Sequence, residues 1–234
     1  MLIESYLQRS GLTEWDNLNH LEIKREIQWL EHYLDQQPAA EVQWQYLVPE
    51  LGEGGACSLF GQLADAPYDL AATLGGRTLH HEKALQQLQC FCQAFQQRTG
   101  MEWFGIYQAR VNKAQQPVLV KLAYYGAPSR AEFPLSKDFS RYSNNSTVGL
   151  TGIARVINDI PQYLARGGDY YTCDPKVQAE ACLPLFDQSG KIVGIIDAEA
   201  FQQNVFHPAS LALLVAICLM VPAFLPVADP SSSD

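Results

Sequence analysis

Apolar side chains recur at helical spacing in three parts of the chain. Between residues 21 and 35 they return every three or four positions, which predicts a helix with one apolar stripe. The same spacing over residues 82–99 predicts a second helix, and Gly100 directly after it is the residue type that most often ends helices. A third helix is predicted from about Pro208, because proline is well tolerated in a first helical turn.

Segments with the composition of β-strands lie between the second and third helices. Residues 103–111 and 118–125 are β-rich, and the polar turn between them predicts an antiparallel pair. Residues 180–186 and 191–198 predict a β-hairpin around a turn that ends at Gly190. The order of helix, two strands, loops, hairpin and helix predicts an α+β fold with a central antiparallel sheet flanked by helices.

The remaining segments are expected to connect these elements. Residues 50–76 are rich in Gly, Ala and Pro and are expected to form loops with short turns. Residues 149–156 are expected to form a loop that leads into a short helix, and residues 159–174 a long loop over the site. The pattern of residues along the sequence changes near residue 80. The chain therefore divides into an N-terminal helical and loop extension, a core domain and a flexible tail: residues 1–80, 81–225 and 226–234.

The composition narrows the classes of partner. With 234 residues, 47% of them hydrophobic and 18% charged, the chain has an ordinary globular composition. Its net charge of −9 argues against nucleic acid, because phosphate binding needs a surplus of Lys and Arg on one face. The apolar run of residues 211–224 is shorter than the ~20 residues of a membrane-spanning helix and is interrupted by Pro222. We therefore expect it to be buried or to form a dimer interface.

The first residues and the cysteines indicate the compartment. The N-terminus lacks a positive segment followed by an apolar run, so we expect no signal peptide. The spacing of the six cysteines matches neither a zinc module nor a dense disulfide scaffold, and the five histidines show no ligand spacing. A cytoplasmic protein with reduced thiols and no metal is expected.

Thiol and carboxyl side chains gather around the predicted hairpin: Cys173, Asp174, Glu180, Asp197 and Glu199. Because strand side chains repeat every two residues, Glu180 and Cys182 share a face, and so do Asp197 and Glu199. A structural interpretation stands beside the functional one. Cys173 can be a chance loop cysteine, Cys182 a core residue and Glu180 the partner of a nearby basic residue, while the two later acids can be solvated at a strand end.

Five motifs together resemble a known family. They are Trp103-Phe-Gly-Ile-Tyr107, Gly149-Leu-Thr-Gly-Ile-Ala154, Cys173-Asp174 with Glu180 and Pro184-Leu185, Gly194-Ile-Ile-Asp-Ala-Glu199, and Phe206. This pattern resembles the GAF domain, and within it the free methionine-(R)-sulfoxide reductases. The resemblance covers roughly residues 81–225 and leaves the N-terminal third unexplained.

The resemblance implies roles for individual residues. Cys173 would be the nucleophile that attacks the sulfoxide sulfur, with Asp174 beside it. Glu180, Asp197 and Glu199 would hold the substrate's amino group and supply a proton to the leaving oxygen. The aromatic strand and the glycine-rich loop would add the other substrate-binding residues, Trp103, Tyr107 and Thr151. Implied partners are a small-molecule ligand, a thioredoxin-type reductant and a second copy of the chain in a homodimer through the end helices; no cofactor is implied.

The sequence also departs from that family. The family's loop cysteine is replaced by Thr151, so its usual resolving thiol is absent, and Glu199 is one methylene longer than the family's second Asp. Cys182 is a possible substitute resolving thiol if its face is the pocket face. Carboxylates raise the pKa of a nearby thiol by like-charge repulsion, whereas an ammonium on the substrate offsets that effect. Two functions remain open: a divergent methionine sulfoxide reductase, or a non-catalytic GAF module that binds an amino-bearing ligand.

Overall fold

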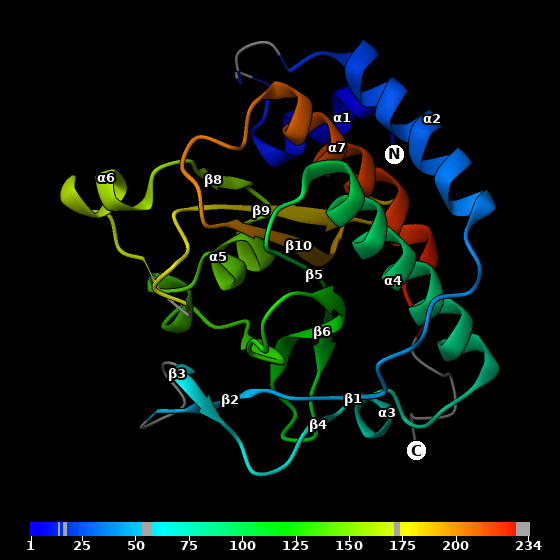
Figure 1. Cartoon of the computed structure of the whole chain (residues 1–234), viewed down its shortest axis with the longest axis vertical. Coiled ribbons are helices and arrows are strands. Elements are labelled where there is room, and N and C mark those ends of the chain that lie inside the picture. Colours follow the sequence, from blue (N-terminus) through cyan, green and yellow to red (C-terminus); the bar gives the residue numbers. More distant parts are fainter. Residues whose placement is uncertain (14, 16–17, 53–57, 171–173, 228–234) are drawn as a thin grey trace.

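A computed structural model describes residues 1–13, 15, 18–52, 58–170 and 174–227, so Cys57 and Cys173 lie outside the described part of the chain. Its centre is a six-stranded antiparallel sheet with the strand order β7-β6-β5-β10-β9-β8 (Figure 1). The strands are β5 (Trp103–Val111), β6 (Pro117–Tyr125), β7 (Glu132–Pro134), β8 (Arg155–Ile157), β9 (Ala179–Phe186) and β10 (Ile192–Ala200). The predicted strand pair and the predicted hairpin are therefore confirmed.

Two long helices cover one face of the sheet. Helix α4 (Leu79–Thr99) packs on β5 and β6, and α7 (Pro208–Met220) packs on β9. Helix α2 (His20–Gln36) lies outside them and contacts both (Figure 1). The three helices predicted from the sequence are thus present. Helix α4 begins because Thr78 accepts a hydrogen bond from the His81 backbone amide, and ends because Gly100 adopts a left-handed conformation with φ of 69°.

Shorter helices complete the fold. On the sheet face opposite to α4 and α7, α5 contacts β9, β10 and β6. Helix α1 contacts β9, and two 3-10 turns follow β7 and α7. The bounds of these elements are α1 Ile3–Ser10, α3 Leu70–Thr73, α5 Asn144–Thr151, α6 Ile160–Ala165, and 3-10 turns Phe139–Arg141 and Val221–Phe224.

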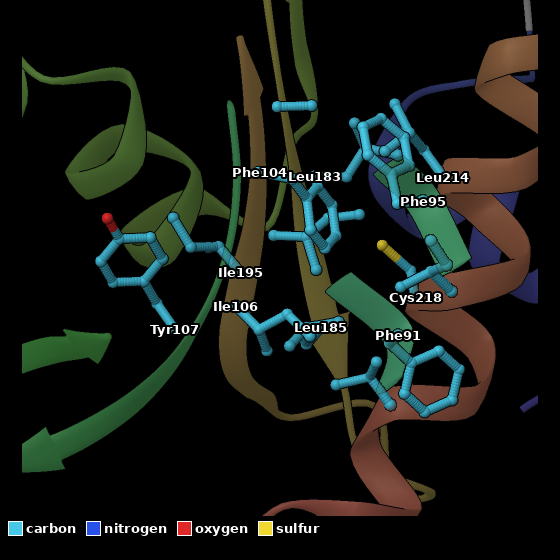
Figure 2. Close-up of a cluster of buried hydrophobic side chains, with 14 of the residues drawn as sticks. Phe91, Phe95, Phe104, Ile106, Tyr107, Leu183, Leu185, Ile195, Leu214 and Cys218 are labelled. Atoms are coloured by element: carbon cyan, nitrogen blue, oxygen red, sulfur yellow. The ribbon is translucent and has the colours of Figure 1, made fainter. Parts of the chain in front are cut away.

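The sheet separates an apolar face from a mixed one. Figure 2 shows Phe104 and Leu183 on the side that faces the helices, and Tyr107 on the opposite side. The Phe104 ring stacks on Phe95 of α4 with ring centroids 4.4 Å apart. Burial of one side chain of this size stabilises the fold by about 1.5–3 kcal/mol. The helix-covered face therefore supplies the hydrophobic stabilisation, which leaves the other face for polar groups.

The N-terminal extension packs against both faces of the sheet. On the helix side, buried Tyr6 of α1 donates a hydrogen bond from its hydroxyl to the Pro184 carbonyl of β9 at 3.0 Å. On the other side, the Tyr46 hydroxyl donates to the Lys121 carbonyl of β6 at 2.7 Å. Leu7, Leu30 and Tyr46 all belong to the same hydrophobic cluster as the sheet. The extension is therefore part of one continuous core.

The extension also contains small strands. β1 (Gln45–Tyr46) pairs with β4 (Tyr68–Asp69), and β2 (Pro49–Leu51) pairs with β3 (Ser58–Leu63). The expectation of loops with short turns over residues 50–76 was therefore wrong. Its composition is poor in the β-branched residues that mark strands, and the pairing comes from contacts between segments instead.

Two further expectations about loops are corrected. The segment 149–156 is not a loop before a helix, because α5 ends at Thr151 and residues 155–157 form strand β8. The segment 159–174 contains helix α6, which begins where Asp159 accepts a hydrogen bond from the Gln162 amide. Strand β8 lies at the edge of the sheet and has three residues. A segment this short carries too little periodicity to be predicted.

The apolar terminal segment is buried within this chain. Residues 210–218 of α7 are buried, and α2 and α4 both contact that helix. Among the described residues no helix is both long and apolar enough to cross a membrane. The burial of α7 needs no second copy, so the homodimer stays a prediction.

The hydrogen bond from Tyr6 gives a first test. Beyond Cys182, β8 no longer pairs with β9, and the Tyr6 hydroxyl satisfies the Pro184 carbonyl further along that strand. Tyr6→Phe should lower the free energy of unfolding by about 1–2 kcal/mol, because a buried acceptor loses its donor. Urea unfolding measures this change. Tyr142→Phe, at an exposed tyrosine, should leave the free energy unchanged; equal effects of the two variants would show that α1 does not secure β9.

Candidate functional site

Three carboxyl groups meet on the sheet face that the long helices leave uncovered. In the register of β9 and β10, Glu199 lies opposite Glu180 and Asp197 opposite Cys182. Since directly paired residues of an antiparallel sheet point to the same face, all three acids project to one side. Both Glu180 and Asp197 are buried, with exposed fractions of 5% and 3%. The sequence predicted only that acids within one strand share a face. The register shows that the acids of both strands lie on the same face.

The N-terminus of α5 closes over these acids. Ser143 caps the helix by accepting from the Ser146 amide, and the next two residues are buried asparagines. Asn145 donates its side-chain Nδ2 to Asp197 Oδ2 at 2.9 Å, and Asn144 hydrogen-bonds to Glu180. A helix N-terminus favours nearby negative charge, which makes this a suitable place for carboxylates.

A small cavity remains between α5 and the acids. Its volume is about 20 Å³, and its lining includes Asn144, Asn145, Glu180, Asp197 and Glu199. We call it the acid cavity. A space of this size holds roughly one water molecule. It therefore has room for a single small polar group.

One oxygen in this cavity lacks a partner. Asp197 Oδ2 is held by Asn145, whereas Asp197 Oδ1 is buried and has no hydrogen-bond partner among the described residues. An unsatisfied buried polar atom costs about 1–3 kcal/mol, so native proteins rarely retain one without a role. The arrangement presents an oxygen that a donor on a ligand can satisfy.

The acids keep each other protonated. Burial and the charges of Glu180 and Glu199 raise the pKa of Asp197 well above its usual range. Burial, followed by the charges of Glu180 and Asp174, raises the pKa of Glu199 to about 8, although Lys121 opposes the shift. Two buried carboxyl groups and the half-buried Glu199, this close together, cannot all be ionised at neutral pH. The site therefore favours a cation, which would stabilise the ionised forms.

Glu180 is the best compensated of the three acids. Burial raises its pKa, but hydrogen bonds from Tyr170 and Asn144 and the charge of Arg155 lower it. Arg155 lies on the neighbouring strand β8, and its guanidinium donates to the Tyr163 hydroxyl at 2.7 Å. The charge of Arg155 on the edge strand therefore favours the ionised form of Glu180.

Aromatic side chains continue the site along β5. Trp103 lies opposite Glu199, and its indole Nε1 donates to the Ala127 carbonyl at 3.0 Å. Its ring lies across Gly105, where an added Cβ would approach the ring to 2.4 Å. Tyr107 lies further along the same face, and burial and the charge of Asp197 raise its pKa. The glycine thus permits a flat aromatic wall beside the acids.

A buried lysine stands behind that wall. Lys121 Nζ donates to the Ser129 carbonyl at 2.8 Å and lies 3.9 Å from the centroid of the Tyr124 ring and 4.8 Å from that of Tyr46. Tyr46 belongs to the N-terminal extension. The extension therefore reaches the same side of the sheet as the acids.

The structure places the remaining predicted residues differently. Cys182 shares the face of the acids but is 0% exposed and belongs to the hydrophobic core, and burial raises the pKa of its thiol well above the usual value. Thr151 lies at the C-terminal end of α5 and is exposed; its hydroxyl donates to the Thr147 carbonyl at 2.8 Å. The structure therefore does not bring Thr151 to the acid cavity, whose α5 residues come from the other end of the helix.

The structure describes only one of the two residues of the Cys-Asp step, Asp174. Cys173 lies outside the described residues. Asp174 is half-buried, and its Oδ1 accepts from the Lys176 amide at 2.9 Å. Its charge acts on Glu199, which places it near the predicted substrate-binding acids.

Sequence reasoning missed three residues of the site. Asn144 and Asn145 hold the acids from α5, and Tyr170 hydrogen-bonds to Glu180. The one available signal was the run Ser143-Asn-Asn-Ser146, a helix-start pattern with polar residues that the fold then buries. Among the described residues no group of three or more His, Cys, Asp or Glu side chains is arranged to hold a metal ion.

Comparison with known proteins identifies the class. The sequence model of the GAF domain matches residues 83–221, more than half of the chain, so this protein belongs to the GAF domain family. The predicted fold is thereby confirmed. No curated protein sequence matches the chain.

Solved structures with the same fold include both reductases and other GAF domains. The type II free methionine-R-sulfoxide reductase from Thermoplasma acidophilum is 24% identical, with a TM-score of 0.52 over 62% of this chain and 94% of that one. The GAF domain of a phosphoenolpyruvate-protein phosphotransferase from Coxiella burnetii is 11% identical, with a TM-score of 0.53 over 88% and 93% of the two chains. Free methionine-R-sulfoxide reductase from Neisseria meningitidis is 19% identical, with a TM-score of 0.47 over 70% and 93%. The two likenesses with TM-scores above 0.5 support the GAF fold.

The raised pKa of Glu199 predicts how stability depends on pH. Between its usual value of 4.5 and about 8, the folded protein retains a proton that the unfolded chain releases. Stability then falls as pH rises, because the unfolded state binds fewer protons. We expect the free energy of unfolding to decrease from pH 5.5 to pH 8, and Glu199→Gln to reduce that decrease.

Urea unfolding at the two pH values measures this difference. Glu31→Gln, at an exposed glutamate on α2, serves as the control and should retain the wild-type decrease. A Glu199→Gln variant whose decrease matches that of the control would show that Glu199 is not protonated in the folded protein.

Proposed function

We propose that the acid cavity binds the ammonium group of a small amino-bearing ligand. The unpartnered Asp197 Oδ1 is the observation that carries this proposal. An ammonium has three donors and no acceptor, so it can satisfy that oxygen and contact the neighbouring carboxylates. Its charge also offsets the repulsion that raises the pKa values of Asp197 and Glu199.

The size of the cavity fits this assignment. At about 20 Å³ it accepts one group the size of a water molecule, which is also about the size of an ammonium group. Binding of the cation would release the proton of Glu199, because the ionised form of this acid is then favoured. The ligand's affinity should therefore rise with pH up to about 8, the pKa of Glu199.

We further propose that the ligand is free methionine-(R)-sulfoxide and that the protein reduces it as a divergent reductase. In this reaction the Cys173 thiol attacks the sulfoxide sulfur, the sulfur–oxygen bond breaks, and the oxygen passes to the cysteine. The products are methionine and a Cys173 sulfenic acid. A second thiol then forms a disulfide with Cys173 and releases water, and a dithiol of the thioredoxin type restores the reduced enzyme.

The protonated acids have a part in this chemistry. A carboxyl group with a raised pKa remains protonated near neutral pH and can donate its proton to the sulfoxide oxygen. Asp197, whose pKa is raised well above its usual range, meets this requirement, while Glu180, the best compensated acid, and the ionised Glu199 are suited to hold the ammonium. The supporting evidence is this separation of pKa values on one sheet face.

A non-catalytic ligand-binding function is the second candidate. It is favoured by the placement of the other thiols: Cys182 is fully buried, and the position of the expected loop cysteine is occupied by Thr151 at the far end of α5. In this case the same cavity would bind an amino-bearing ligand for signalling, and Cys173 would have no chemical role.

A turnover assay distinguishes the two candidates. Purified protein with free methionine-(R)-sulfoxide and dithiothreitol should form methionine, and Cys173→Ser should abolish the reaction. Asp197→Asn should reduce turnover by about 10²-fold or more, because a proton donor and a ligand contact are lost. If folded wild-type protein binds the sulfoxide but forms no methionine, the reductase function is excluded and the binding function is supported.

The resolving thiol can be tested separately. Because the Cys182 thiol is buried and burial raises its pKa, we expect the external dithiol to resolve the Cys173 sulfenic acid. Cys182→Ala should then leave turnover with dithiothreitol unchanged. Cys218→Ala, at another buried free cysteine, controls for packing effects. Lost turnover in Cys182→Ala alone would make Cys182 the resolving thiol.

A further inference from the structure

A second, larger hollow adjoins the acid cavity. Its volume is about 270 Å³, and we call it the hairpin cleft; residues that line it include Leu59, Phe60, Trp103, Asp174, Glu199 and Phe201. Glu199 lines both the acid cavity and the hairpin cleft. A ligand whose ammonium lies among the acids can therefore extend along Glu199 into this cleft.

One wall of the cleft comes from outside the GAF match. Leu59 and Phe60 lie on strand β3 of the N-terminal extension, whereas the family match begins at residue 83. The opposite wall is formed by Trp103 of β5 and by Phe201, which follows β10. Phe60 is 55% exposed and is one of the residues that line the cleft. The extension thus adds an apolar surface to the ligand side of the sheet.

The charges of the cleft select among apolar ligands. Its described lining includes the carboxyl groups of Glu102, Asp174 and Glu199 and no basic side chain. The Glu102 carboxylate accepts from the Phe201 amide at 3.0 Å, and Asp174 accepts from the Lys176 amide. A largely apolar cleft that also contains carboxylates complements a cation that carries an apolar group.

We propose that the hairpin cleft binds the apolar or aromatic substituent of a primary amine whose ammonium lies in the acid cavity. This inference rests on the proposed ammonium site alone and widens its ligand class beyond methionine sulfoxide, to amines that carry a bulkier apolar group. The acid cavity holds only one small group, so the rest of any such ligand must lie elsewhere. The cleft offers apolar surface next to Glu199, the residue that lines both the cleft and the acid cavity.

Three probes test the two parts of this binding mode. Ethylamine carries the ammonium alone, 2-phenylethylamine adds an aromatic ring, and 3-phenylpropionate has the ring with a negative charge. NMR titration measures their dissociation constants. We expect 2-phenylethylamine to bind about tenfold more tightly than ethylamine, because its ring is removed from water, and 3-phenylpropionate not to bind.

Two variants of the same hairpin locate the ring. Phe60→Ala removes a cleft wall and should weaken 2-phenylethylamine about fivefold while leaving ethylamine unchanged. Leu51→Ala, on β2, removes a 42% exposed side chain that is not among the cleft residues and should change neither. The melting temperature of each variant shows whether the fold is intact.

The outcomes separate this inference from the proposed function. If both amines bind and Phe60→Ala behaves like Leu51→Ala, the hairpin cleft does not hold the substituent, while the ammonium site stands. If Phe60→Ala weakens both amines equally, the hairpin acts on the fold rather than on the ring, and the inference also fails. If neither amine binds folded protein, the ammonium site fails and the inference with it.

Discussion

Glu180, Asp197 and Glu199 are forced together because two paired strands present them on one face of the sheet. Like charges this close in a buried place oppose folding unless they are protonated, hydrogen-bonded or balanced by a cation. The protein uses the first two means: the pKa values of Asp197 and Glu199 are raised, and α5 contributes amide donors. In the proposed function, the ammonium of the ligand supplies the third. The repulsion that costs stability is therefore the same interaction that would give affinity for an ammonium.

The sheet makes this arrangement tolerable by separating two environments. One face is covered by α4 and α7 and carries the aromatic and aliphatic side chains that stabilise the fold (Figure 2). The other face carries the acids, with Trp103 and Tyr107 beside them. The alternation of side chains along each strand separates the two environments, because neighbouring residues point to opposite faces. The repulsion between the acids is offset by packing on the far side of the same strands.

The N-terminal extension takes part in both environments. Tyr6 secures β9 from the helix side, and the ring of Tyr46 packs against the Lys121 ammonium on the side of the acids. The β2–β3 hairpin then reaches the edge of the acid site and shares a cleft with Glu199. A domain of the GAF family thereby gains a wall that its own sheet does not provide.

The sequence by itself determined the elements whose signals are local. The helix over residues 82–99, the strand pair and the hairpin all followed from periodicity and turn residues, and so did the sharing of a face within each strand. The tertiary structure decided which residues of other segments lie opposite these side chains. The register of β9 against β10 brought Glu180 to Glu199, and the docking of α5 brought Asn145 rather than Thr151 to the acids. The physical reason is that periodicity reports which face a side chain takes, whereas its partner depends on contacts between segments far apart in the chain.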